Sequence, residues 1–160
     1  MKTNPTKVTT VKTDVLIIGS GGAGLRTAIE LHDNKVDCLV VGKCKLREAH
    51  TKWAQGGINA ALKTMDPGDS WQLHAADTIA DGGYINDPIA VSTLCKNAPK
   101  AIEELAQWGC KFHREKDKKI TQRFFGAAMY RRACFVGDVT GEAILNTLVR
   151  QVQKRKIPTM

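Results

Sequence analysis

The chain has 160 residues, of which 42% are hydrophobic and 25% charged, with a formal net charge of +8. No apolar run reaches the ~18–20 residues that a membrane span needs. The basic residues are dispersed and do not alternate with aromatic ones, which argues against nucleic-acid binding and leaves anionic metabolites or acidic partners. The polar start, MKTNPTKVTTVKTD, lacks a secretory apolar stretch, so we expect a cytoplasmic protein with a flexible lead over residues 1–13.

Cysteine usage limits the chemistry further. None of the five cysteines forms a C-x-x-C pair, and their number is odd. This pattern argues against a zinc site, an iron–sulfur cluster or a disulfide framework and predicts scattered reduced thiols. They are Cys38, Cys44, Cys95, Cys110 and Cys134.

The first elements predict a βαβ unit. Residues 14–18 read DVLII, a continuous apolar run typical of a parallel strand that is buried on both faces. The turn GSGGAG follows, then a helical pattern over 25–34 and a second strand over 37–41. The fold class is therefore α/β, and the unit covers about thirty residues.

The later elements alternate turns and helices. A polar loop covers 43–49 and a turn covers 66–69, after which Asp69 or Ser70 is expected to cap a helix through 71–78. We expect a helix from Asp87-Pro88 to Cys95, a further helical stretch over 100–108 that Gly109 stops, and a hairpin over 111–120.

The last predicted helix begins at Thr140 and Gly141. Asp138 and Thr140 are expected to form its turn and cap. Its apolar side contains Ile144, Leu145, Leu148, Val149 and Val152. After Lys156 the letters IPTM look like the start of a strand, so we expect a fragment of a longer chain.

Gly19, Gly21 and Gly24 have the spacing G-x-G-x-x-G directly after a strand and before a helix. The first glycine permits a tight turn, the second lets backbone approach a pyrophosphate, and the third lets the helix pack on the sheet. This context predicts dinucleotide binding; the alternative is a glycine-rich turn without ligand. The carboxylate that binds ribose is replaced by Gly42-Lys43, where Gly42 could admit the ribose and Lys43 could reach a phosphate or be solvated.

Two further segments contain candidate site residues. His50–Gly57 reads HTKWAQGG, and its glycine pair suits either a flat ligand or a turn; by residue type alone, His50 is interpreted as a surface histidine. The other segment, QRFFGA, covers residues 122–127, and by residue type alone its Phe125 reads as a core aromatic. Arg131 and Arg132 could bind an acidic group, but we expect surface arginines.

Four ordered segments resemble the flavoprotein subunits of succinate dehydrogenase and fumarate reductase, a group that includes L-aspartate oxidase. They are VLIIGSGGAGLRTAIEL, HTKWAQGGINAAL, DSWQLHAADTIADGGYINDP, and the stretch from QWGCKF to EAILNTL. The resemblance implies that residues 14–160 are the N-terminal part of a Rossmann-like FAD-binding domain with a central parallel sheet. In that family the capping domain and the residues that clamp substrate lie further along, so this stretch alone is expected to be inactive.

The resemblance also implies roles for individual residues. His50 matches the histidine that is joined covalently to FAD, whereas L-aspartate oxidases have another residue there and bind FAD noncovalently. Phe125 matches a phenylalanine that lies against the dicarboxylate. Ala49, Lys52, Trp53 and Ala127 depart from the family pattern. The remaining implied FAD contacts are Gly19, Gly21, Gly22, Ala23, Gly24, Lys43, Thr51, Ala54, Gln55, Gly56 and Gly57.

The activity implied by the resemblance is hydride transfer between flavin and a dicarboxylate, which interconverts succinate and fumarate. Electrons would leave through an iron–sulfur subunit, and membrane-anchor subunits would hold the protein at the inner face of the cell membrane. Two alternatives are L-aspartate oxidase and a truncated, non-catalytic flavin-binding module. His50 favours the first reading over L-aspartate oxidase.

Overall fold

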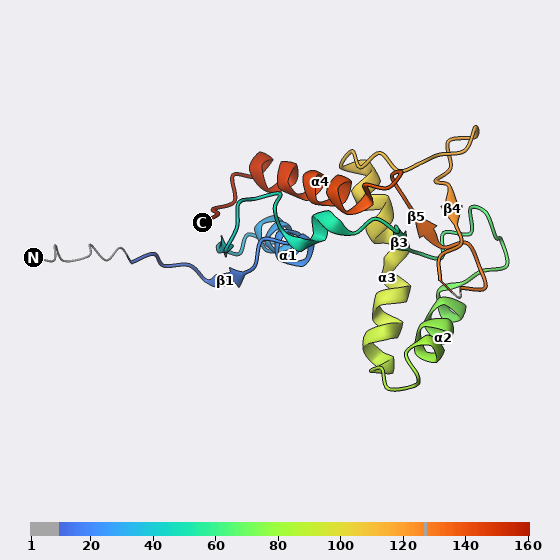
Figure 1. Cartoon of the computed structure of the whole chain (residues 1–160). Helices are drawn as coiled ribbons and strands as arrows, with labels where there is room; N and C mark the ends of the chain where they lie inside the picture. The colour runs from blue at the N-terminus through green and yellow to red at the C-terminus, as the bar shows by residue number, and fades with distance from the viewer. Residues whose placement is uncertain (1–9, 127) are drawn as a thin grey trace, which may run out of the picture.

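The computed structural model describes residues 10–126 and 128–160; the first nine residues of the expected lead and Ala127 lie outside them (Figure 1). Five strands, four α-helices and one 3₁₀ turn follow in the described chain. In order they are β1 (Val15–Ile18), α1 (Gly22–Asp33), β2 (Cys38–Val41), η1 (His50–Trp53), β3 (Ile58–Asn59), α2 (Trp71–Asp81), α3 (Pro88–Gln107), β4 (Gln122–Arg123), β5 (Ala133–Cys134) and α4 (Thr140–Lys154).

A parallel sheet forms at the N-terminal end. β1 pairs in parallel with β2, from Val15 opposite Cys38 to Ile18 opposite Val41. The other edge of β2 pairs with the end of the chain, where the Met160 N–H donates to the Val40 carbonyl at 2.8 Å. A parallel bridge joins Val40 and Thr159, which confirms the strand onset expected after Lys156. The predicted βαβ unit and its parallel sheet are thus present.

The prediction that β1 is buried on both faces is wrong. Ile17 is buried against α1, but Leu16 is 54% and Ile18 84% exposed. Successive side chains of a strand point to opposite faces, so α1 covers only one of them. The opposite face of β1 is exposed in the described part of the chain.

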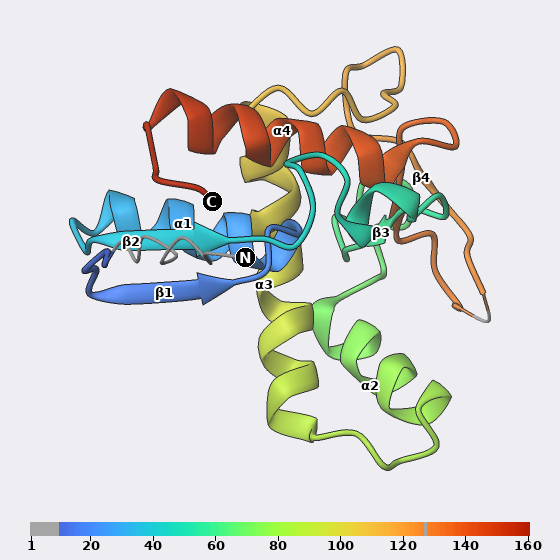
Figure 2. The same cartoon turned by 60° about the vertical axis from the view of Figure 1, so that its left-hand side comes forward.

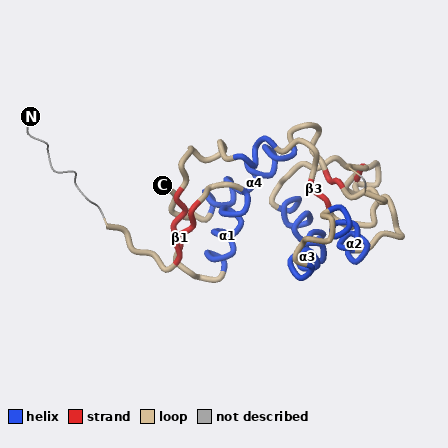
Figure 3. Tube along the Cα trace, turned by 60° about the horizontal axis from the view of Figure 1, so that its bottom comes forward, coloured by secondary structure: helices blue, strands red, loops and turns tan. Residues whose placement is uncertain are grey.

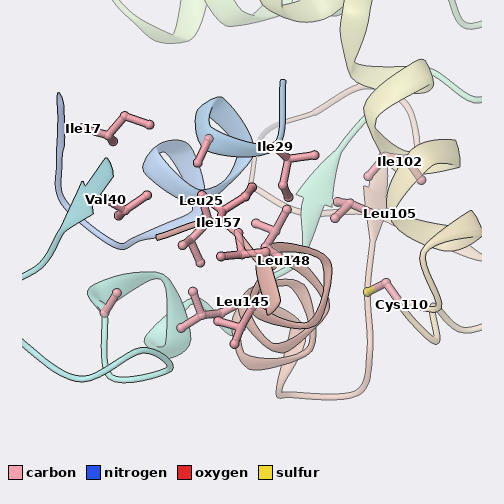
Figure 4. Packing of buried hydrophobic residues seen from close by; sticks show 14 of the residues in the cluster. Ile17, Leu25, Ile29, Val40, Ile102, Leu105, Cys110, Leu145, Leu148 and Ile157 are labelled. Atoms are coloured by element: carbon pink, nitrogen blue, oxygen red, sulfur yellow. The ribbon is translucent and has the colours of Figure 1, made fainter. Parts of the chain in front are cut away.

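The core lies where α1 and α4 meet the parallel sheet. Leu25 and Ile29 of α1 pack with Leu145 and Leu148 of α4, and Ile157 closes the cluster (Figure 4). On the α4 face, Leu145, Leu148, Val149 and Val152 are buried as their spacing predicts. Ile102 and Leu105 extend this core into α3.

α2 and α3 form a helical hairpin that lies apart from β1 and β2 (Figure 2). Ser70 caps α2 by accepting from the Leu73 N–H, and Asp87 caps α3 with Pro88 at its first position. The two stretches predicted over 88–95 and 100–108 are one helix that continues through Pro99. Proline removes one helical hydrogen bond, but Cys95 and Ile102, buried on either side of it, keep the helix packed.

A small antiparallel sheet, in the order β3-β5-β4, lies beside the helical hairpin of α2 and α3. Figure 3 shows α2, α3 and β3 at one end of the molecule and β1 and α1 at the other, with α4 between them. Gln122 fastens this sheet, because its buried amide donates to the carbonyls of Ala60 and Arg132 at 2.6 and 3.1 Å. The hairpin predicted over 111–120 is present, with Arg114 bridged to Ile120.

The start of α4 differs from the prediction. Val139 occupies the cap position and no side chain caps the helix. The Thr140 hydroxyl instead accepts from the Val136 N–H at 3.0 Å, and Asp138 is exposed. In the described residues, no helix is both long enough and apolar enough to cross a membrane.

Candidate nucleotide-binding site

The glycine turn between β1 and α1 forms the base of the site. Gly19 has a φ of +120°, which favours glycine, and its N–H donates to the Val41 carbonyl at 2.8 Å. A Cβ on Gly24 would collide with the carbonyl oxygen of Gly19 and lie 3.3 Å from the Ile17 side chain. The first glycine therefore permits the turn, and the third lets α1 lie directly on β1.

Thr51 fills the space beside the turn. Its hydroxyl accepts a hydrogen bond from the Gly22 N–H at 2.9 Å, and Gly21, at the cap position, has no side chain to do so. A Cβ on Gly21 would lie 3.3 Å from the same hydroxyl. In the first turn of a helix the N–H groups lack acceptors within the helix, so those of Ala23 and Gly24 remain for an anion.

A cavity lies at the end of β2, where a dinucleotide-binding domain usually has the carboxylate that binds ribose. The cavity measures about 360 Å³, and Ser20, Cys44, Lys45 and Met160 are among its lining residues. The Ser20 hydroxyl is buried and has no hydrogen-bond partner. A Cβ on Gly42 would collide with that hydroxyl. Lys43 is exposed and is not among the lining residues, whereas Ser20 and Lys45 bring a hydroxyl and an ammonium group to the cavity.

The second motif forms the 3₁₀ turn η1 and the segment after it. His50 begins the turn and is exposed, while Ala49 before it is buried. The start of α4 supports this loop, because the Gly141 N–H donates to the Ala54 carbonyl at 2.6 Å. A Cβ on Gly141 would collide with the carbonyl of Thr51. The loop that presents His50 is therefore held between the glycine turn and α4.

The glycine pair, Gly56 and Gly57, contacts the segment that contains Arg123 and Phe125. A Cβ on Gly56 would lie 2.6 Å from two carbons of the Phe125 ring. Phe125 is 56% exposed, so it is not a core aromatic. Arg123 donates to the Gly56 carbonyl at 2.9 Å from the same segment. Gln55 is exposed beside the pair.

The two arginines at 131 and 132 are not free surface arginines. Arg132 is 1% exposed and pairs with Asp69 at 2.7 Å and with Asp77 at 2.6 Å. Arg131 pairs with Asp66, and its hydrogen bonds lower the pKa of that carboxyl. Both arginines directly precede β5 and join it to the segment before α2, and Arg132 also joins it to α2 through Asp77, so neither is free for an acidic ligand.

Of the five cysteines, Cys44 lines the cavity at the end of β2. Four of the five are buried, and Cys44 is partly so. Burial raises the pKa of the Cys134 thiol to about 12, so this thiol is neutral and inert as a nucleophile.

Sequence reasoning missed Ser20, Arg123 and the burial of Arg132. Ser20 stands inside the predicted glycine motif, and this position was the available signal. The partners of Arg123 and Arg132 gave no signal, because they lie 55 to 67 residues away in the sequence.

β1 and β2 form a parallel sheet, and the glycine turn after β1 exposes the first N–H groups of α1. The loop of His50, which Gly141 supports, lies beside this turn. Together these features define a dinucleotide-binding α/β domain. The FAD binding domain family matches residues 14–160, and the chain belongs to that family.

The chain is similar to flavoprotein subunits of known enzymes. It is 43% identical to a fumarate reductase (CoM/CoB) subunit of Methanothermobacter marburgensis, over 92% of this chain and 27% of that protein. It is 40% identical to the succinate dehydrogenase flavoprotein subunit of Rickettsia bellii, over 91% and 26%. Among solved structures, the Mycobacterium smegmatis Sdh1 complex in the apo form superposes with a TM-score of 0.87 at 40% identity, over 90% of this chain and 25% of that chain. The chain thus spans about a quarter of the length of these relatives.

Proposed function

We propose that residues 14–160 are the N-terminal part of the FAD-binding domain in the flavoprotein subunit of a succinate dehydrogenase or fumarate reductase. FAD would bind with its pyrophosphate at the first turn of α1 and with its ring toward Gly56 and Gly57. His50 would form the covalent link. The hydrogen bond from Gly22 to Thr51 carries this proposal, because it joins the phosphate-binding turn to the loop of His50.

The residues present fit this cofactor. The N–H groups of Ala23 and Gly24 suit a pyrophosphate, and the unpartnered Ser20 hydroxyl lines the cavity at the end of β2, where the ribose is expected. Gly56 and Gly57 present backbone without side chains, which suits a flat ring system. Lys43, Ala54 and Gln55 are exposed along the same loops and remain proposed contacts.

FAD, when bound, supplies the hydride chemistry. The residues of this chain would bind and orient it, and Phe125, whose ring lies beside Gly56, would cover one side of a dicarboxylate. The complete enzyme would interconvert succinate and fumarate and pass electrons to an iron–sulfur subunit. Membrane-anchor subunits would hold that assembly at the inner face of the cell membrane. The similarity to complex-forming flavoprotein subunits supports this assembly.

The covalent link can be tested by acid precipitation of the purified protein. We expect yellow flavin to stay in the pellet of the wild type, and to enter the supernatant for His50→Ser. His32→Ser is the matched control, because His32 is also exposed but lies at the other end of α1, and it should retain the flavin. Flavin released from the wild type would rule out the link, and flavin retained by His50→Ser would show that another residue forms it.

A further inference from the structure

Arg123, in β4 of the small sheet, contacts the segment that contains Gly56 and Gly57. Its Nη2 atom donates to the Gly56 carbonyl at 2.9 Å, and the two residues are 67 positions apart in the sequence. Phe125, two residues further on, places its ring against the Cα of the same glycine. The segment that contains Arg123 and the segment that contains the glycine pair are therefore fastened to each other at Gly56.

The guanidinium of Arg123 is itself held in place. Its central carbon lies 4.2 Å from the centroid of the Phe135 ring, which favours a cation stacked on an aromatic face. Phe135 in turn stacks on His113, with ring centroids 4.7 Å apart. Among residues 10–126 and 128–160, no carboxylate forms an ion pair with Arg123. The charge of Arg123 therefore acts on the Gly56 carbonyl without competition from an acidic side chain in this part of the chain.

Holding one carbonyl orients a whole peptide. The peptide between Gly56 and Gly57 is planar and trans, so the direction of the Gly56 carbonyl fixes the opposite direction of the Gly57 N–H. Gly57 has a φ of +124°, and a Cβ there would lie 2.9 Å from the Cys134 carbonyl. The Cys134 carbonyl of β5 therefore leaves no room for a side chain at Gly57, while Arg123 holds the carbonyl oxygen of Gly56.

We propose that Arg123 is a positioning residue for the flavin: it fixes the Gly56–Gly57 peptide as a pre-oriented hydrogen-bond donor beside the ring. This inference rests on the proposed FAD site. A lysine would keep the charge but lacks the planar guanidinium that stacks on Phe135 and donates to the carbonyl together. The structural role and the charge can therefore be separated by substitution.

The first experiment follows the Gly57 amide resonance by NMR in the chain without FAD. Arg123→Met should shift this resonance, and Arg123→Lys should shift it as well. Arg114→Met is the matched control, because Arg114 is exposed and donates to the Lys118 carbonyl, away from the glycine pair. A Gly57 resonance that stays in place in Arg123→Met would overturn the proposal.

The second experiment titrates FAD and records its visible absorption bands. Arg123→Met and Arg123→Lys should each bind FAD about tenfold more weakly and alter the bands, as expected for one lost charged hydrogen bond. Arg114→Met should match the wild type. If Arg123→Met fails to fold, Phe135→Leu removes the stacking partner and should weaken binding in the same direction. Wild-type affinity and bands in the folded variants would overturn the role of Arg123, whereas a wild-type chain that takes up no FAD would overturn the proposed function and this inference with it.

Discussion

The hydroxyl oxygen of Thr51 lies 2.9 Å from the backbone nitrogen of Gly22 and accepts its hydrogen bond. Thr51 thereby acts as a cap for α1 that comes from 29 residues away, since the residue before the helix is a glycine. The bond fastens the loop of His50 to the glycine turn between β1 and α1.

We predict that Thr51→Val lowers the free energy of unfolding by about 1–2 kcal/mol, because a helix N–H loses its acceptor. Urea unfolding followed by circular dichroism measures this loss. Thr51→Ser keeps the acceptor and should lose less than half as much. A valine variant as stable as the wild type would show that water replaces the hydroxyl without cost.

Gly24 and Gly68 form a matched pair for testing the packing of α1 on β1. Gly24→Ala would place a Cβ against the Gly19 carbonyl, a backbone atom that cannot move without separating helix and strand. We expect a loss of about 1–3 kcal/mol in the free energy of unfolding, together with weaker FAD binding. Gly68 has no atom within 4 Å of the corresponding position, so Gly68→Ala should change stability by no more than about 0.5 kcal/mol. Equal stability of the two variants would contradict this account.

Removing Arg132 should be far more damaging than removing its neighbour. Arg132→Met leaves Asp69, which is 2% exposed, as a buried charge without a partner, and we expect a loss of about 3–5 kcal/mol in the free energy of unfolding. The side chains of the Arg131–Asp66 pair are 34% and 20% exposed, so Arg131→Met should cause a much smaller loss. Denaturant unfolding of both variants makes the comparison, and similar losses would argue against a structural role specific to Arg132.

His74 should make the stability depend on pH. Burial lowers its pKa, and the nearby charge of Arg132 lowers it further, although Asp69 and Asp77 oppose this. Below about pH 6.5, the ordinary value for histidine, the unfolded chain therefore binds a proton that the folded protein resists. Stability due to neutral His74 should be present above that pH and be lost as pH falls toward the lowered folded-state pKa.

The measurement is urea unfolding of wild type and His74→Gln between pH 7.5 and 5.0. The wild type should lose stability across this window, and the variant should lose less, since glutamine does not titrate. Parallel pH profiles for the two proteins would show that His74 is not the group responsible.

Local pattern was enough to predict the strand, the glycine turn and the helix that follows it. Strand, glycine turn and helix are neighbours in the chain, and the contact of Gly24 with the Gly19 carbonyl spans only five positions. The caps at Ser70 and Asp87 were predictable for the same reason. We expected a break in the helix before residue 100, and this was wrong. The low helix propensity of Pro99 is overcome because Cys95 and Ile102, on the same helix, are both packed in the interior.

The amino-acid sequence by itself determined the βαβ unit, the candidate phosphate site and the family resemblance, because each depends on residue types at short, fixed spacings. The tertiary structure alone decided that Thr51 caps α1, that Arg132 is buried between two carboxylates, and that Arg123 holds Gly56. These contacts join residues 29 to 67 positions apart, and no local periodicity encodes which distant group a buried polar side chain meets. Packing of the core brings these polar groups together. A buried polar group without a hydrogen bond costs free energy, so the groups that meet in the interior become hydrogen-bond partners.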